Sequence, residues 1–170
     1  MDKSKKSLRL FSWADYDLTP ARRIELEGFC LQYAEKKERA KKLPEFALAL
    51  SDYSEDKLDS EIARLTRASL LRDYNRAERA LKDQRLIEGA VAWAARAGEH
   101  PEVRRALLVN VTKEISYKTL ASAYKLSLKT QDFHGIRRAF FYRLDRLKRL
   151  EEFEAIERGI STTSEEETTT

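Results

Sequence analysis

The sequence predicts an all-α protein in which an N-terminal helical hairpin or coiled-coil region precedes a C-terminal helix-turn-helix domain. Only five glycines and three prolines occur in 170 residues, so the chain has few points at which helices must end. Charged residues make up 36% of the composition and hydrophobic residues 42%, which suits amphipathic helices around a core. Apolar residues also recur at steps of three and four, the spacing of one helix face.

We expect four parts along the chain. Residues 1–18 are predicted to be mobile or loosely docked, with packing on the protein's own helices as the default. Residues 19–98 form a helical region that can serve oligomerisation. Residues 99–158 form the helix-turn-helix domain, and residues 159–170, rich in glutamate and threonine, form a disordered tail.

The first helix is expected to begin at Thr19-Pro20, with threonine as the N-cap and proline in the first helical position. It should run to about Lys42, because Leu43-Pro44 disfavours helical backbone before the proline. Residues 43–54 are then expected to form a connector over the helices.

Ser54 is the predicted N-cap of the next helix. Its apolar pattern is interrupted at residues 66–69, so either one long helix with a shifted seam or two helices fit the spacing. The outer face carries charges of both signs, which is typical of a helical hairpin or coiled coil. A dimer seam and packing within one chain both remain open.

Residues 86–97 are the least charged part of the chain. We expect four of them to lie in or near the core: Val91, Trp93, Ala94 and Ala95. Gly98 is the predicted helix stop, and His100-Pro101 the start of a supporting helix. That helix packs on the motif through Leu107, Leu108 and Val111.

The motif itself begins with Ser116 as the N-cap of a short helix from Tyr117 to about Tyr124. Residues 125–127 form the turn, and either Ser127 or Thr130 caps the second helix. That helix is expected to run through Phe153 and Ile156 to Arg158 and to end at Gly159. Its apolar face is predicted to be Phe133, Ile136, Phe140, Leu144 and Leu147.

The polar side of the second helix is predicted to contact DNA. Residues 101–150 hold twelve Lys and Arg against four Asp and Glu, a net charge of +8, whereas residues 151–170 hold seven Glu against one Arg, a net charge of −6. Such a local basic field is typical of nucleic-acid binding. The base-reading candidates are Lys129, Gln131, His134, Arg137 and Arg138. The phosphate-contacting candidates are Lys118, Lys125, Arg143 and Arg146.

Two alternatives stay open within this motif. A basic amphipathic helix can simply be a solvated face over a core. Gly135, inside the helix, indicates either close approach of a DNA backbone or neighbouring helix, or simple tolerance at a cost of roughly 1 kcal/mol.

The same stretch resembles a known family. The segments that carry the likeness are Val111-Thr112-Lys113, Ile115-Ser116-Tyr117, Asp132-Phe133, Arg137-Arg138-Ala139-Phe140-Phe141 and Leu144-Asp145. Over residues 107–147 they look like the C-terminal signature of the RinA/ArpU-type activators of phage late genes, in which "VTKGISY" precedes "DF…RRKFF…LD". Glu114 stands where that family often has glycine, and Ala139 where it often has lysine. The resemblance implies a DNA-binding transcription activator.

We find no pattern for catalysis, for a cofactor or for a metal ion. The sequence contains no phosphate-cradling glycine loop, no nucleophile–base set and no Cys/His ligand spacing around His100 or His134. The one cysteine, Cys30, fits a packing role in a reducing cytoplasm. No run of ~20 apolar residues predicts a membrane span.

The leading hypothesis is therefore a sequence-specific regulator of transcription that binds double-stranded DNA in the cytoplasm. If a phage encodes the protein, this is the cytoplasm of the host cell. The helices of residues 20–97 would form a homo-oligomer, with a dimer favoured, or touch RNA polymerase. A small terminase-like DNA-packaging protein is the second hypothesis. A helical adaptor that binds only protein is the third.

Overall fold

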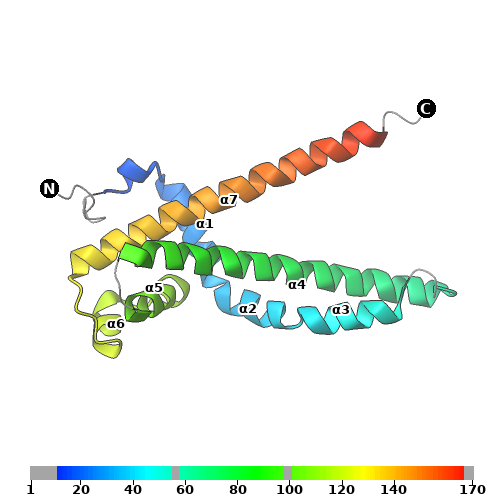
Figure 1. Cartoon of the computed structure of the whole chain (residues 1–170), viewed down its shortest axis with the longest axis horizontal. Helices are drawn as coiled ribbons and strands as arrows, with labels where there is room; N and C mark the ends of the chain where they lie inside the picture. The colour runs from blue at the N-terminus through cyan, green and yellow to red at the C-terminus, as the bar shows by residue number, and fades with distance from the viewer. Residues whose placement is uncertain (1–10, 55–57, 98–100, 167–170) are drawn as a thin grey trace.

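The computed structural model describes residues 11–54, 58–97 and 101–166, and the described chain is helical without any strand (Figure 1). The all-α prediction is confirmed. The helices are α1 (Pro20–Leu31), α2 (Tyr33–Lys41), α3 (Leu43–Asp52), α4 (Glu61–Ala94), α5 (Pro101–Lys113), α6 (Tyr117–Ala123) and α7 (Thr130–Glu166), with short 3₁₀ turns η2 (Ala14–Tyr16) and η4 (Ala95–Ala97).

Helix α1 begins where the sequence predicts. The Thr19 side chain accepts a hydrogen bond from the Arg22 backbone N–H at 3.2 Å, and Pro20 occupies the first helical position. The predicted single helix to Lys42 is instead two helices, because the chain leaves regular α geometry at Gln32. Leu26 and Cys30 of α1 and Tyr33 of α2 are buried in the core.

The prediction of a connector over residues 43–54 is wrong, since Leu43–Asp52 forms α3. Pro44 lies in the first turn of α3, where a backbone N–H has no partner within the helix and its absence costs nothing. The proline therefore separates two helices and starts the second of them. Leu48 of α3 remains 71% exposed.

Helix α4 is one continuous helix, which settles the question left open by the interrupted apolar pattern. Its N-cap is Ser60, whose side chain accepts from the Ala63 N–H at 3.1 Å, so the predicted start at Ser54 is wrong. Residues 55–57 lie outside the described part. Trp93, predicted to be in or near the core, is 38% exposed, whereas Val91 and Ala94 are buried.

The charged face of α4 contacts this chain's own α2, and α4 also packs on α3 and α7. Lys36 of α2 pairs with Asp83 at 2.6 Å, and the Tyr33 hydroxyl donates to Glu88 at 2.6 Å. These contacts show packing within one chain along part of the seam that the sequence left undecided.

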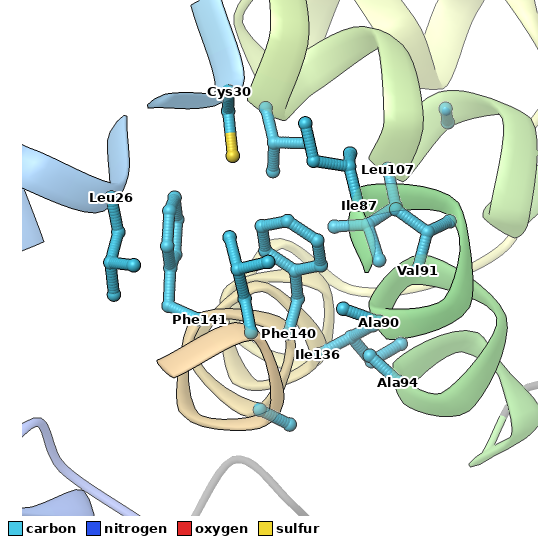
Figure 2. Close-up of a cluster of buried hydrophobic side chains, with 14 of the residues drawn as sticks. Leu26, Cys30, Ile87, Ala90, Val91, Ala94, Leu107, Ile136, Phe140 and Phe141 are labelled. Atoms are coloured by element: carbon cyan, nitrogen blue, oxygen red, sulfur yellow. The ribbon is translucent and has the colours of Figure 1, made fainter. Parts of the chain in front are cut away.

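The core lies where α1, α4, α5 and α7 converge (Figure 2). Phe140 and Phe141 of α7 point toward Leu26 of α1, Ile87 of α4 and Leu107 of α5. The predicted apolar face of α7 is confirmed: Phe133, Phe140 and Leu144 have no exposed surface, Ile136 is buried, and Leu147 packs on the cluster. Both predicted helical regions thus contribute to one hydrophobic cluster.

Helix α7 is longer than expected. It continues through Gly159 to Glu166, so the predicted end at Gly159 is wrong, and so is the prediction of disorder for residues 160–166. Residues 167–170 lie outside the described part, as do Gly98 and His100, which were predicted to flank the break before α5. In Figure 1 the C-terminal half of α7 diverges from α4 and leaves the helical body.

Residues 11–18 are docked on α7. Leu18 is buried, Trp13 contacts Phe141 with ring centroids 6.0 Å apart, and Tyr16 stacks on Tyr142 at 4.9 Å. The expected packing of this segment on the protein's own helices is confirmed for these residues, and residues 1–10 lie outside the described part.

Candidate nucleic-acid interface

Helix α6 and the start of α7 are joined by a connection whose geometry is set by backbone hydrogen bonds. The Ser116 side chain caps α6 by accepting from the Thr119 N–H, as predicted. At the other end, Lys125 adopts a left-handed conformation with φ of 52°. The Leu126 N–H then reaches the Ala121 carbonyl at 3.0 Å and the Lys125 N–H reaches the Ser122 carbonyl at 3.4 Å, the hydrogen bonds of a Schellman motif.

The connection spans residues 124–129 and is longer than the 3–4 residues common in helix-turn-helix motifs. Thr130 is the first residue of α7, so the N-cap position falls on Lys129 and neither predicted cap occupies it. The Tyr117 hydroxyl donates to the Leu128 carbonyl, and its ring contacts Phe133 at 4.7 Å. Burial raises the pKa of Tyr117, which keeps the hydroxyl protonated as a donor.

Five of the nine predicted DNA-contacting side chains are exposed around this connection. Gln131 and His134 lie in the first turns of α7, and three lysines surround them. The lysines are Lys118 on α6, Lys125 in the connection and Lys129 at the start of α7. Lys118 and His134 line the same surface hollow, which α6 and α7 share with Glu114.

Burial on the opposite side of α7 fixes the direction of these polar residues. Phe133 has no exposed surface and Ile136 is buried, so the helix cannot rotate about its axis without exposing them. Gly135 is buried as well. A DNA backbone therefore does not reach it from solvent, and close approach of a neighbouring helix or simple tolerance remain as explanations for this glycine.

The Arg137 side chain is 26% exposed and lines the same hollow as Lys118 and His134, but its guanidinium already has partners. Its Nη2 pairs with Glu27 of α1 at 3.0 Å, its Nε donates to Asn110 Oδ1 of α5 at 3.1 Å, and its guanidinium stacks over the Phe141 ring at 4.9 Å. The Asn110 amide in turn donates to the Ile115 carbonyl at 2.8 Å. These contacts argue against Arg137 as a base reader and assign it to the junction of α1, α5 and α7.

Of the other three arginines, Arg138 lies one turn from His134, whereas Arg143 and Arg146 lie apart from Lys118, Lys125 and Lys129, which we call the lysine face. Arg138 donates through Nε to the Phe11 carbonyl at 2.7 Å. Arg143 lies over Trp93 at 5.6 Å, and Arg146 over Tyr142 at 5.7 Å. Positions 138, 142 and 146 follow one side of α7 along the docked N-terminal segment, and Arg146 is about 18 Å along the axis from His134. The structure therefore does not bring Arg143 and Arg146 into the lysine face.

The environment of His134 lowers its pKa below the usual value of 6.5. Partial burial contributes most, and the positive charges of Arg137 and Arg138 add to the shift. The imidazole is therefore neutral near pH 7, with one nitrogen able to donate and the other able to accept a hydrogen bond.

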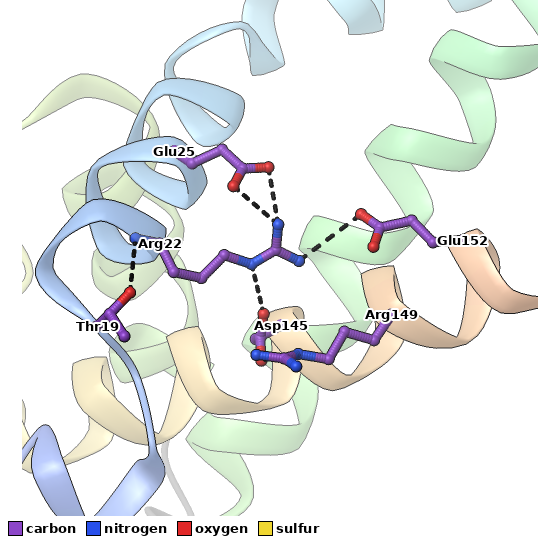
Figure 3. Close-up of polar contacts among 6 residues, drawn as sticks. All are labelled: Thr19, Arg22, Glu25, Asp145, Arg149 and Glu152. Atoms are coloured by element: carbon purple, nitrogen blue, oxygen red, sulfur yellow. Dashed lines mark hydrogen bonds and ion pairs between the residues drawn. The ribbon is translucent and has the colours of Figure 1, made fainter.

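An ion cluster around the buried Asp145, which sequence analysis did not anticipate, holds α1 against α7 (Figure 3). Asp145 is 4% exposed and accepts from Arg22 Nε at 2.6 Å and from Arg149 Nε at 2.8 Å. Arg22 also pairs with Glu25 at 2.8 Å and with Glu152 at 3.7 Å. The one available signal was a carboxylate beside Leu144 of the apolar face, which requires a partner when buried.

Neither a metal-ligand group nor a membrane-spanning helix is found among the described residues. His, Cys, Asp and Glu side chains do not gather there in a group of three that could hold a metal ion. No helix in that part is long and apolar enough to cross a membrane. The Cys30 thiol is buried, and burial raises its pKa to about 12, so it is unreactive as a thiolate near neutral pH.

Comparisons of the chain with models of protein families, with curated proteins and with solved structures each return no match. The likeness to the RinA/ArpU-type activators therefore stays a prediction from the motif.

Proposed function

We propose that this protein regulates transcription by binding double-stranded DNA, with α6 and the first turns of α7 acting as a helix-turn-helix. The observation that supports the proposal best is the exposed set around the N-terminus of α7. Gln131 and His134 project from its first turns and Lys118, Lys125 and Lys129 flank them. Activation of phage late genes is the form of regulation that the sequence motif favours.

Each member of the set has a role that its chemistry allows. The three lysines offer ammonium groups for phosphates and give affinity and register without reading sequence. Gln131 can pair with an adenine edge in the major groove, and the neutral His134 can donate to or accept from a base. The N-terminus of α7 adds a partial positive charge that also favours phosphate.

Arg137 and Asn110 have a positioning role in this proposal. Their mutual hydrogen bond and the Arg137–Glu27 ion pair connect the reading helix to α5 and α1. A change at Arg137 is therefore expected to alter the direction of α7 and to reduce stability, which makes it a poor probe of base contact.

Two left-handed residues provide a better test. Lys125 and Glu114 have φ of 52° and 54°, a conformation that glycine adopts without strain. Lys125→Gly and Glu114→Gly therefore both preserve the backbone. The first removes a positive charge from the connection, and the second removes a negative charge from the hollow that Lys118 and His134 line. We expect Lys125→Gly to weaken binding to duplex DNA and Glu114→Gly to tighten it, each by about two- to fivefold at low salt.

Fluorescence anisotropy with duplex fragments selected from genomic DNA measures both variants across a salt series. Lys125→Gly should also reduce the slope of log affinity against log salt by about 0.9, the contribution of one phosphate contact. Wild-type protein without salt-dependent affinity for any duplex would refute the proposal and favour a helical adaptor that binds protein. If the affinity for DNA changes in the same direction and by the same factor in both glycine variants, DNA binds elsewhere on the chain.

A further inference from the structure

The C-terminal half of α7 carries apolar side chains that nothing in the described chain covers. Leu150, Phe153 and Ile156 are 57%, 58% and 60% exposed and follow one another at steps of three. We call these three residues the arm stripe. Exposed apolar residues scattered singly are normal, but three in adjacent turns of one helix form a continuous surface.

The arm stripe faces away from the rest of the molecule. On the same helix, Lys148, Glu151 and Ala155 line the cleft that α7 forms with α4. At 100° per residue these three positions lie on the side of α7 opposite Phe153. Closing the cleft would therefore leave the arm stripe exposed.

One pair of opposite charges flanks the arm stripe at equal spacing from its centre. Arg149 and Glu157 each lie four residues from Phe153, so they stand about 40° to either side of it and one turn to either end. Leu150 and Ile156 each lie three residues from Phe153, about 60° to either side. The pattern is therefore symmetric about Phe153 in apolar character and antisymmetric in charge at Arg149 and Glu157, whereas Glu152 and Glu154 beside Phe153 carry the same charge.

We infer that a second copy of this chain packs on the arm stripe, with the two α7 arms antiparallel and Phe153 at the twofold axis. The partner's Ile156 then stands at the height of Leu150, and the partner's Glu157 at the height of Arg149. A parallel arrangement would set Arg149 beside Arg149 and Glu157 beside Glu157, which like-charge repulsion disfavours. A twofold contact of this kind closes on itself and stops at a dimer.

The contact is small. Three apolar residues per copy bury less than the roughly 1,200–2,000 Å² of a stable interface, so we expect a dimer that dissociates on dilution. This inference uses neither the lysine face nor any DNA contact, and it stands or falls separately from the proposed function.

Sedimentation equilibrium of the whole chain over a range of concentrations tests the dimer. The wild-type mass is expected to rise toward twice 19.8 kDa as concentration increases. Phe153→Glu puts two carboxylates at the axis and should stay monomeric. The matched control is Leu48→Glu, which places the same charge on a leucine of α3 that is 71% exposed and should behave as wild type.

Three results would overturn the inference: a wild type that stays monomeric throughout, a Phe153→Glu variant that still dimerises, or a Leu48→Glu variant that dissociates as well. Circular dichroism establishes that both variants fold, which the exposure of both positions leads us to expect.

Charge reversal at Glu157 tests the orientation. In the antiparallel dimer Glu157→Lys faces the partner's Arg149, so the dissociation constant should rise by about fivefold, and less at high salt. In a parallel dimer the same change only replaces one like pair by another and should leave the constant unaltered. Glu45→Lys on α3 changes the net charge equally and serves as the control, with no change expected.

Discussion

The two halves of α7 carry apolar residues at similar spacing, but these residues are buried in the first half and exposed in the second. In the first half, Phe133, Phe140 and Leu144 have no exposed surface, and α1, α4 and α5 surround them. In the second half, Leu150, Phe153 and Ile156 are each more than half exposed. One continuous helix thus passes from a core into solvent without losing its apolar residues.

This difference shows what orients a polar side chain. In the first half, burial of one face fixes the direction of the other, so Gln131 and His134 point outward and Arg137 points into a junction with Glu27. In the second half no described part of the chain fixes the apolar side. Its order is expected to come from another molecule.

The largest expected effect tests the comparison directly. Phe140→Ala removes a fully buried ring and should lower the free energy of unfolding by roughly 3–5 kcal/mol. Phe153→Ala, at a dilution where the chain is monomeric, should change it by about 0.5 kcal/mol or less. Urea unfolding of both variants measures the two values. Comparable losses would mean that the second half of α7 is covered after all.

The next effect concerns the ion cluster of Figure 3, which joins α1 to the first half of α7. Asp145→Ala leaves Arg22, with a side chain only 18% exposed, beside an empty buried site and should cost roughly 3 kcal/mol. Glu25→Ala removes an exposed partner of the same arginine and should cost about 0–1 kcal/mol. If the two variants lose the same free energy of unfolding in urea, the burial of Asp145 does not determine how much the cluster stabilises the protein.

The sequence predicted those parts of the fold that local chemistry determines. Thr19 and Ser116 cap helices because their side chains reach N–H groups three residues away. The apolar face from Phe133 to Leu147 follows from helical spacing alone. By contrast, Leu43-Pro44 predicts a helix stop, although proline in a first turn equally starts a helix, and this ambiguity concealed α3.

The location of the candidate site could be predicted from the sequence better than the identity of the residues that form it. The outward direction of Gln131 and His134 follows from the buried face of their own helix. The pairing of Arg137 with Glu27 joins residues 110 positions apart in the sequence, and no local pattern reveals it. The Asp145–Arg22 pair spans 123 residues and was missed for the same reason.

A smaller effect on stability is expected at the two left-handed residues beside the lysine face. Lys125→Gly and Glu114→Gly relieve left-handed strain and should each raise the free energy of unfolding by about 0.5–1 kcal/mol. Ser122→Gly, within helical α6, should instead lower it by about 0.5 kcal/mol. Thermal unfolding of the three variants separates the signs. Destabilisation by Lys125→Gly would mean that the Lys125 side chain makes contacts that outweigh the strain.

The smallest effect is a pH dependence at His134. Because its pKa is lowered in the folded protein, protonation favours the unfolded chain. The associated stability is therefore fully present above the unfolded pKa of about 6.5 and is lost as the pH falls below it.

Phosphates near His134 would raise its pKa, so DNA binding should take up part of a proton. Affinity should then increase as the pH falls from about 7.5 to 5.5, by less than tenfold per unit. His134→Gln keeps a hydrogen-bonding side chain without this titration, and its affinity should be flat over that range. An unchanged pH slope in the variant would assign the proton to another group and place His134 outside the contact with DNA.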